Sequence, residues 1–318
     1  MQNLQKQLQT VIETLKSAGF KVKVLNYPYD SRKRSVDVIA SNGEKDLLMK
    51  VVDDTSELRS YEVHELNALS ATLKASPLII ASKISGHPLE DYIAYEKYST
   101  YVVTSMTFKA IVKDKENIYV YYSRGGFYVK VNPKEFRRAR LSRGMSLGEL
   151  GRLLGVTRKA IYEYERGAID VSIERAERIV EVLDEEVLEP INIFETPSTD
   201  KEHIPMHLKL SERIIMDNLK NLGYRVCHVE RTVIDLAASK EQAMRDGKLA
   251  ILVEHEKDKK NGLLIKAKES EKLEEVMKVK RYAIVSKRST LRELEDIGIE
   301  VARSWNELKE QIQLEVKK

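Results

Sequence analysis

The spacing of apolar residues near the start of the chain predicts a helix followed by a strand. Val11, Ile12 and Leu15 recur at helical spacing, and Gly19 then ends the helix because glycine takes a left-handed conformation without steric cost. From Phe20 to Leu25 apolar and polar residues alternate, which is typical of a strand with one buried face. The same pattern returns 204 positions later, with the corresponding residues Ile215, Met216, Leu219, Gly223 and Tyr224.

Further apolar runs follow each of these two segments in the same order. The predicted strands are LLMK at 47–50, LIIAS at 78–82, LLIK at 263–266 and YAIVS at 282–286. A short strand and a helix that starts at serine close each copy, at 102–111 and 301–312. Short apolar strands resemble one another by chance, but the ordered recurrence of several elements favours a duplicated α/β domain with a mixed sheet covered by helices.

Residues 133–167, between the two copies, have the pattern of a helix-turn-helix. Ser146 and Glu149 form a capping box, which starts a helix by satisfying free backbone N–H groups. The apolar residues of this predicted helix lie on one side: Leu147, Leu150, Leu153 and Leu154. Gly155 ends the helix, Val156 lies between the two helices, and Thr157 is a favourable N-cap for the second helix.

The second predicted helix divides into an inner and an outer face. Ala160, Ile161 and Tyr164 fall on the inner face. In a helix-turn-helix the first turn of this helix is polar and exposed to the bases of DNA. The candidates for DNA contact are therefore the outward residues Thr157, Arg158, Lys159 and Tyr162.

Positive charge is concentrated in the same segment. Residues 133–167 contain nine Lys or Arg against four Glu, a net of +5 in a chain whose formal charge is +4. Such a concentration is expected where phosphate contacts supply affinity that does not depend on sequence. We expect the DNA backbone to be contacted by Arg137, Arg138, Arg140 and Arg143. Any single arginine, Arg166 especially, could instead cap a helix or pair with a glutamate.

A β-hairpin is predicted before the helix-turn-helix, and a helix and a linker are predicted after it. Residues 118–131, IYVYYSRGGFYVKV, predict a β-hairpin, because Gly125 and Gly126 can turn the chain between two alternating strands. The hairpin is either a basic wing with Arg124 at its tip, or an aromatic-rich element that packs the helix-turn-helix against the first α/β domain or against its partner. A further helix is predicted over 172–183, and the proline-containing stretch that follows predicts a linker.

Composition excludes several other classes of protein. Cys227 is the single cysteine, so an internal disulfide and a cysteine-based zinc site are both excluded. The six histidines show no metal-ligand spacing, and Pro205 separates His203 from His207. No apolar run approaches the roughly 18 residues that span a bilayer. We therefore expect a cytoplasmic protein without a metal, a cofactor or a membrane partner.

The central segment resembles the XRE, or lambda-repressor-like, helix-turn-helix family. The residues that match the family pattern are Leu147, Leu150, Gly151, Leu154, Gly155, Val156, Thr157, Ile161, Tyr164, Glu165, Arg166 and Gly167. Gly151 stands where the family usually has Ala, which keeps a close helix crossing but costs about 1 kcal/mol of helix propensity. Ser146 stands where many members have Gln, so a glutamine contact does not carry over, although Ser146 remains a candidate for DNA contact. The resemblance implies double-stranded DNA as partner.

The order of elements in the flanks resembles the core of the restriction-endonuclease-like superfamily. That resemblance implies an Asp, then an Asp or Glu, one further residue and a Lys, with the carboxylates holding a divalent metal. Asp37 and Lys50 fit the outer positions, but Leu48 occupies the middle position and cannot bind a metal. In the second copy Leu264 precedes Lys266 at the same spacing. We interpret both copies as nuclease-like folds without nuclease chemistry.

The predicted organisation is multidomain. The expected parts are an α/β nuclease-like domain at 1–115, a β-hairpin connector at 116–131, an all-α XRE-type helix-turn-helix domain at 132–190, a linker at 191–204 and a second α/β domain at 205–318. Taken together, these parts resemble archaeal proteins classed as helix-turn-helix transcriptional regulators.

The function that this organisation predicts is regulation of transcription by a sequence-specific DNA-binding protein. A homodimer would place two helix-turn-helix domains on half-sites about one helical turn, or a multiple of it, apart, and the flanks would supply dimerisation or partner docking. Two alternatives stay open: a metal-dependent nuclease that uses Asp37 and Lys50, and an antitoxin-like scaffold that holds a protein partner.

Overall fold

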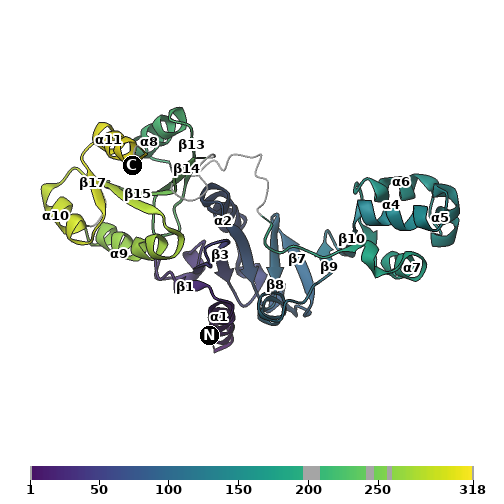
Figure 1. Ribbon diagram of the computed structural model, residues 1–318. Coiled ribbons are helices and arrows are strands. Elements are labelled where there is room, and N and C mark those ends of the chain that lie inside the picture. Colours follow the sequence, from purple (N-terminus) through teal and green to yellow (C-terminus); the bar gives the residue numbers. More distant parts are fainter. Residues whose placement is uncertain (1, 196–207, 241–246, 256–259, 317–318) are drawn as a thin grey trace.

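The computed structural model describes residues 2–195, 208–240, 247–255 and 260–316. Two α/β units lie together at one end of an elongated molecule, and a group of short helices lies at the other end (Figure 1). We call residues 2–114 the first α/β unit, residues 133–183 the reader and residues 208–316 the second α/β unit. Strands β9 (Val120–Ser123) and β10 (Gly126–Val131) run from the first unit to the reader.

The first α/β unit is built on a mixed sheet. Its helices are α1 (Gln2–Ser17), α2 (Ser60–Leu73) and α3 (Ser105–Lys109), and its core strands are β1 (Lys21–Val24), β2 (Val38–Ser41), β3 (Asp46–Val51), β4 (Ser76–Ile80) and β8 (Thr100–Val103). Strands β1, β2 and β3 are antiparallel, whereas β3, β4 and β8 are parallel. Hydrophobic clusters lie on both faces of this sheet, so Leu47, Leu48 and Met49 of β3 are all fully buried.

The sheet continues from the first α/β unit into the reader. Strand β7 (Ile93–Lys97) pairs with β8 and with β9, and β9 forms a hairpin with β10. Strand β10 then pairs with β11 (Val171–Ser172) and with β12 (Leu188–Glu189), which flank the last helix of the reader. The predicted hairpin is therefore confirmed. One strand of the hairpin pairs with the first unit and the other pairs with the reader. This arrangement favours a hairpin that packs the reader against the first unit, and disfavours a free basic wing.

The reader consists of four helices: α4 (Pro133–Ser142), α5 (Leu147–Leu154), α6 (Arg158–Glu165) and α7 (Ile173–Leu183). Its core contains Phe136, Leu150, Leu154, Ile161 and Ile179, all of which are fully buried. The predicted inward position of Leu153 is wrong, because its side chain is 57% exposed. An eight-residue helix buries only a narrow stripe against its neighbours, and Leu153 lies outside the stripe that includes Leu150 and Leu154.

The chain returns to the first α/β unit after the reader. Ile191 donates its backbone N–H to the carbonyl oxygen of Ile118 at 2.7 Å, and Ile191 and Ile193 are buried in a cluster of the first unit. Ser76 donates its hydroxyl to the carbonyl oxygen of Phe194. Residues 191–195, which were expected to begin a linker, are therefore anchored to the first unit through the buried Ile191 and Ile193, while residues 196–204 lie outside the described residues.

The second α/β unit contains a separate five-stranded sheet in the order β13-β14-β15-β16-β17. Its elements are α8 (Leu210–Asn221), β13 (Tyr224–His228), β14 (Leu236–Lys240), β15 (Leu249–Val253), α9 (Lys260–Met277), β16 (Lys280–Ile284), α10 (Arg288–Asp296), β17 (Glu300–Ala302) and α11 (Trp305–Val316). As in the first unit, the first three strands are antiparallel and the next pairings are parallel.

One predicted strand of the second unit is wrong. The run LLIK at 263–266 lies inside helix α9, and the third strand is instead β15, LAILV at 249–253. Leu263 and Ala267, four positions apart, are both buried on one face of α9. A match of four residues cannot distinguish a strand from one turn of a helix. The pairing of β15 with β14 and β16 identifies residues 249–253, and not 263–266, as the third strand.

Candidate DNA interface

The turn between α5 and α6 depends on two glycines. Gly155 has φ +65° and ends α5, and the N–H of Val156 donates to the carbonyl oxygen of Gly151 at 2.8 Å. A Cβ atom at position 151 would lie 2.8 Å from the carbonyl oxygen of Val156, closer than real Cβ contacts allow. Thr157 then caps α6, because its hydroxyl accepts the N–H of Ala160 at 3.1 Å. The predicted helix-turn-helix geometry is confirmed in each of these details.

Helix α6 presents its candidate DNA-contacting residues together on the surface. Ile161 and Tyr164 anchor its inner face in the core of the reader. The outer residues Thr157, Arg158, Lys159 and Tyr162 are all exposed. In the part of the chain that the structure describes, Arg158 and Lys159 form no ion pair. Two free cations therefore lie in the first turn of α6, where the helix dipole adds further attraction for phosphate.

The four arginines predicted to contact phosphate have different environments. Arg137 is exposed and has no ion-pair partner within the described ranges. Arg138 pairs with Glu135 and with Glu186, and Arg143 pairs with Asp184 at 2.5 Å. These two side chains therefore also connect α4 to the segment after α7.

The prediction that Arg140 contacts phosphate is wrong. Its side chain is 9% exposed, its Nε lies 2.6 Å from Oε1 of Glu165, and it donates to the carbonyl oxygen of Met145. Arg140 therefore joins α4 to the end of α6. A signal for this role was present in the sequence, because Arg140 lies one helical turn after the core residue Phe136 and on the same face.

Ser146 performs the predicted capping role. Its hydroxyl accepts the N–H of Glu149 at 3.2 Å, and the carboxylate of Glu149 accepts the N–H of Ser146 at 2.7 Å. The hydrogen bonds from Ser146 lower the pKa of Glu149 below its usual value. Ser146 is exposed, so its contact with DNA stays a prediction alongside its capping role.

The nuclease-like carboxylate of the first unit is surrounded by cations. Asp37 accepts the backbone N–H of Val51 at 3.0 Å, and its two oxygens lie 3.2 Å from Nζ of Lys50 and 3.4 Å from Nε of Arg34. All three charged side chains are buried. The structure thus brings Asp37 and Lys50 together as expected, and it confirms that the middle position is the fully buried Leu48. A divalent cation would meet a single carboxylate that two cations already neutralise.

In the second unit the equivalent carboxylate is Asp235. It accepts the N–H of Val253 at 2.9 Å and lies 2.6 Å from Nζ of Lys266, which comes from helix α9 and not from a strand. Leu252, directly before Val253, takes the strand position that Lys50 has before Val51. Among the residues that the structure describes, no group of three or more His, Cys, Asp or Glu side chains is arranged to hold a metal ion.

Sequence reasoning missed a buried carboxylate in the second unit. Glu212 of α8 lies 3.2 Å from Nε2 of His228 and 2.9 Å from Nε2 of His255. Burial raises the pKa of Glu212, but hydrogen bonds from His228 and from the N–H of Lys209 outweigh it and lower that pKa to about 2. His228 and His255 lie 16 and 43 residues after Glu212 in the sequence, and these separations gave no signal for the cluster.

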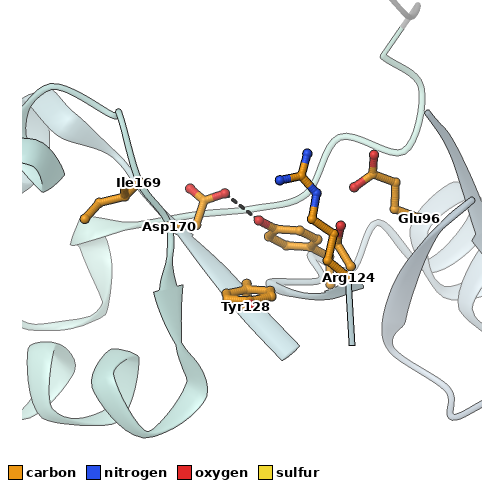
Figure 2. Close-up of a pocket in the computed structure, with 7 residues that line it drawn as sticks. Glu96, Arg124, Tyr128, Ile169 and Asp170 are labelled. Atoms are coloured by element: carbon orange, nitrogen blue, oxygen red, sulfur yellow. Dashed lines mark hydrogen bonds between the residues drawn. The ribbon is translucent and has the colours of Figure 1, made fainter. Parts of the chain in front are cut away.

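A hollow of about 320 Å³ lies at the joint between the first unit and the reader (Figure 2). Glu96 of β7 and Arg124 of the hairpin turn lie on one side, and Asp170 of the reader lies on the other. Tyr121 donates its hydroxyl to Asp170 at 2.5 Å, and burial together with this hydrogen bond raises the pKa of Tyr121. The hydrogen bond connects the hairpin directly to the loop after α6.

Comparison with known proteins agrees with this arrangement. The model of a PD-(D/E)XK superfamily domain matches residues 4–118, and the model of a helix-turn-helix matches residues 136–189. The fold and the reader therefore define a helix-turn-helix protein with a PD-(D/E)XK-type domain at its N-terminal end. No solved structure matches the chain. In the described parts of the chain, no helix is long and apolar enough to cross a membrane.

Several archaeal proteins are similar over most of the chain. A protein of Aeropyrum pernix, named "Putative HTH-type transcriptional regulatory protein", is 32% identical over 282 residues, which are 88% of this chain and 85% of that protein. Proteins with the same designation are 31% identical in Sulfurisphaera tokodaii, over 92% of this chain and 95% of the relative, and 31% identical in Methanocaldococcus jannaschii, over 71% and 70%. The chain belongs to this family of HTH-type transcriptional regulatory proteins.

Proposed function

We propose that the protein regulates transcription by binding double-stranded DNA through α6. The observation that carries this proposal is the outer face of α6, where Thr157, Arg158, Lys159 and Tyr162 are exposed on a helix whose inner face is fixed in the core. In helix-turn-helix proteins the N-terminal residues of the second helix contact base edges in the major groove. Arg137 and Arg138 on the surface of α4, and Arg143 directly after it, would add contacts to phosphate.

The test is the affinity of a double variant, Arg158→Ala with Lys159→Ala, for a DNA site selected from a random pool. Because a good base contact contributes about 1–3 kcal/mol, we expect affinity to fall by about 10- to 1,000-fold. A matched control, Arg292→Ala with Arg303→Ala, removes two exposed positive charges from the second α/β unit and should leave affinity nearly unchanged. Equal affinities of the two double variants would refute the assignment of α6 as the reading helix.

We further propose that two chains bind one site as a homodimer. Twofold symmetry would place the two α6 helices in successive major grooves on one face of the DNA, about 34 Å apart. Hydroxyl-radical footprinting should then show two protected segments related by a palindrome. A single protected segment on every selected site would contradict binding of two chains.

We also propose that the PD-(D/E)XK-type domain does not cleave DNA. This rests on the ion pairs of Asp37 with Lys50 and Arg34, and on Leu48 in place of the second carboxylate. Plasmid and branched DNA incubated with magnesium or manganese should remain intact. Cleavage that persists through purification and disappears in both Lys50→Ala and Asp37→Asn would show that the protein is a nuclease.

A further inference from the structure

The two α/β units repeat the same hydrogen bonds around one aspartate. In each unit the backbone carbonyl oxygen of this aspartate accepts one N–H, its own N–H donates to a second residue, and its carboxylate accepts the N–H of a third. In that order, the partners are Leu25, Met49 and Val51 for Asp37, and Val229, Ile251 and Val253 for Asp235. After the next helix, each unit also has a lysine in the left-handed conformation, Lys74 with φ 52° and Lys278 with φ 56°. These shared features set the equivalence of positions between the two units.

The units contact each other reciprocally. Helix α2 of the first unit packs on β13 and β14, and helix α9 of the second unit packs on β1 and β2. Glu65 of α2 accepts the N–H of Glu230 at 2.9 Å, and Glu269 of α9 accepts the N–H of Asn26 at 2.9 Å. Glu65 and Glu269 each lie nine residues before the left-handed lysine, and Asn26 and Glu230 each follow β1 or β13 by two residues. Equivalent residues thus make the same contact in both directions, as in an interface with twofold symmetry.

One ion pair joins two positions that are themselves equivalent. Asp46 and Lys248 directly precede Leu47 and Leu249, which begin the parallel pairing of β3 with β4 and of β15 with β16. Nζ of Lys248 lies 2.5 Å from Oδ2 of Asp46, with side-chain exposures of 5% and 15%. Equivalent residues meet only at a twofold axis. Two copies of the first unit would place Asp46 against Asp46, and two copies of the second unit would place Lys248 against Lys248.

A single hydrophobic cluster crosses the interface. It contains Leu25, Val63 and Leu66 from the first unit, together with Val229 and Leu273 from the second. An interface with this composition resembles a domain core and is typical of permanent assemblies. The two matching family models end at residues 118 and 189, so neither describes this second unit.

We infer that the second α/β unit is a diverged copy of the first. The interface between the two units of one chain then corresponds to the interface that two identical single-unit chains would form as a homodimer. The unlike charges at Asp46 and Lys248 favour pairing of unlike units and disfavour pairing of like units. The surface on which such units pair is therefore closed inside each chain. Two chains that meet on DNA do so through a surface other than this one.

The test is a charge-exchange series in the full-length protein. Asp46→Lys and Lys248→Asp each place like charges at a buried contact, so each should lower the melting temperature by roughly 6–15 °C. The double variant Asp46→Lys with Lys248→Asp should recover most of this loss. The matched control exchanges Lys23 and Glu275, a pair across the same interface with side chains 38% and 36% exposed, and should shift the melting temperature by at most about 2 °C.

The mass in solution separates an interface within one chain from one between chains. Light scattering should give the mass of one chain for the wild type and for the double variant in the absence of DNA. The inference is overturned if the single variants melt like the wild type. It is also overturned if the wild type is an assembly of two chains that Asp46→Lys separates into single chains. If a single variant is insoluble, Asp46→Asn replaces it and should lower the melting temperature by a smaller amount. Adding Lys248→Met to Asp46→Asn should partly restore the melting temperature. DNA affinity does not enter these measurements, so they are independent of the proposed function.

Discussion

Two arginines three positions apart in α4 show how the environment of a side chain decides its role. Arg137 is exposed and free of ion pairs within the described residues, whereas Arg140 is buried and paired with Glu165 at 2.6 Å. Both carry the same charge and belong to the same basic run. Charge alone therefore predicts attraction to DNA for both, but burial leaves only Arg137 available to phosphate.

This difference predicts opposite effects of the same substitution. Arg137→Ala should leave stability nearly unchanged and weaken binding to all DNA sequences alike, with the salt dependence of binding reduced by about one phosphate contact. Arg140→Ala should destabilise the reader by about 3 kcal/mol, because Glu165 would remain buried without its partner. Urea denaturation and DNA titration at several salt concentrations measure the two effects. Loss of DNA affinity in Arg140→Ala at full stability would contradict the structural role.

Glu212 makes stability depend on pH at the acidic end. Its pKa in the folded protein is about 2, below the usual value of 4.5, because His228 and the N–H of Lys209 donate to it. A lowered folded pKa contributes stability above the unfolded pKa, and this contribution is lost as pH falls from about 4.5 towards 2. The variant Glu212→Gln should therefore lose less stability than the wild type over this range. Parallel curves of unfolding free energy against pH for the two proteins would contradict the assignment.

At the scale of elements, helix α5 shows why one glycine differs from another. Gly148 and Gly151 lie in the same helix, three residues apart. A Cβ at Gly148 would have its nearest neighbour 4.0 Å away, whereas a Cβ at Gly151 would lie 2.8 Å from the carbonyl oxygen of Val156. The turn of the helix-turn-helix crosses α5 at position 151, so only that glycine is required by packing.

The two glycines therefore predict opposite signs for the same substitution. Gly148→Ala should stabilise the reader by about 1 kcal/mol through helix propensity. Gly151→Ala gains the same propensity but must displace the turn, at a typical cost of about 1–3 kcal/mol, so its net effect should be destabilising or at best neutral. Thermal unfolding monitored by circular dichroism compares the two variants directly. A gain in Gly151→Ala as large as that in Gly148→Ala would show that the turn accommodates the methyl group.

At the scale of the whole molecule, the chain consists of a paired α/β body and a reader joined to it by one continuous sheet. The cluster that contains Leu66 belongs to both α/β units, whereas the reader has a core of its own around Leu150 and Ile161. Strands β9 and β10 and the hydrogen bond from Tyr121 to Asp170 connect the two bodies (Figure 1). The orientation of the reader is thus tied to the first α/β unit.

Because the two α/β units share one core, they should lose structure together. Leu66→Ala creates a cavity in a fully buried site and should cost about 2–5 kcal/mol. Hydrogen exchange should then speed up in both α/β units, with the reader unchanged. Leu150→Ala creates the matched cavity in the reader. It should speed up hydrogen exchange in the reader and leave exchange in the two α/β units unchanged. Faster exchange confined to the first unit in Leu66→Ala would contradict a shared core.

The sequence by itself determined those features that depend on neighbours along the chain. The capping box of Ser146 and Glu149, the turn at Gly155 and the outward face of α6 all follow from local spacing, and each is present in the structure. The LLMK strand could likewise be predicted from its apolar run, and the lack of a carboxylate at position 48 follows directly from the residue type there. These features are local, so the free energy that selects them is decided within a few residues.

The tertiary structure decided where similar short patterns have different partners. The letters LLIK form a helix at 263–266 because LAILV takes the place between β14 and β16, and Arg140 is buried because Glu165 lies 25 residues away in sequence but 2.6 Å away in space. The pairing of Asp46 with Lys248, 202 residues apart, follows the same rule. Contacts of this kind depend on which surfaces exclude water together, and that is settled only when the whole chain has folded.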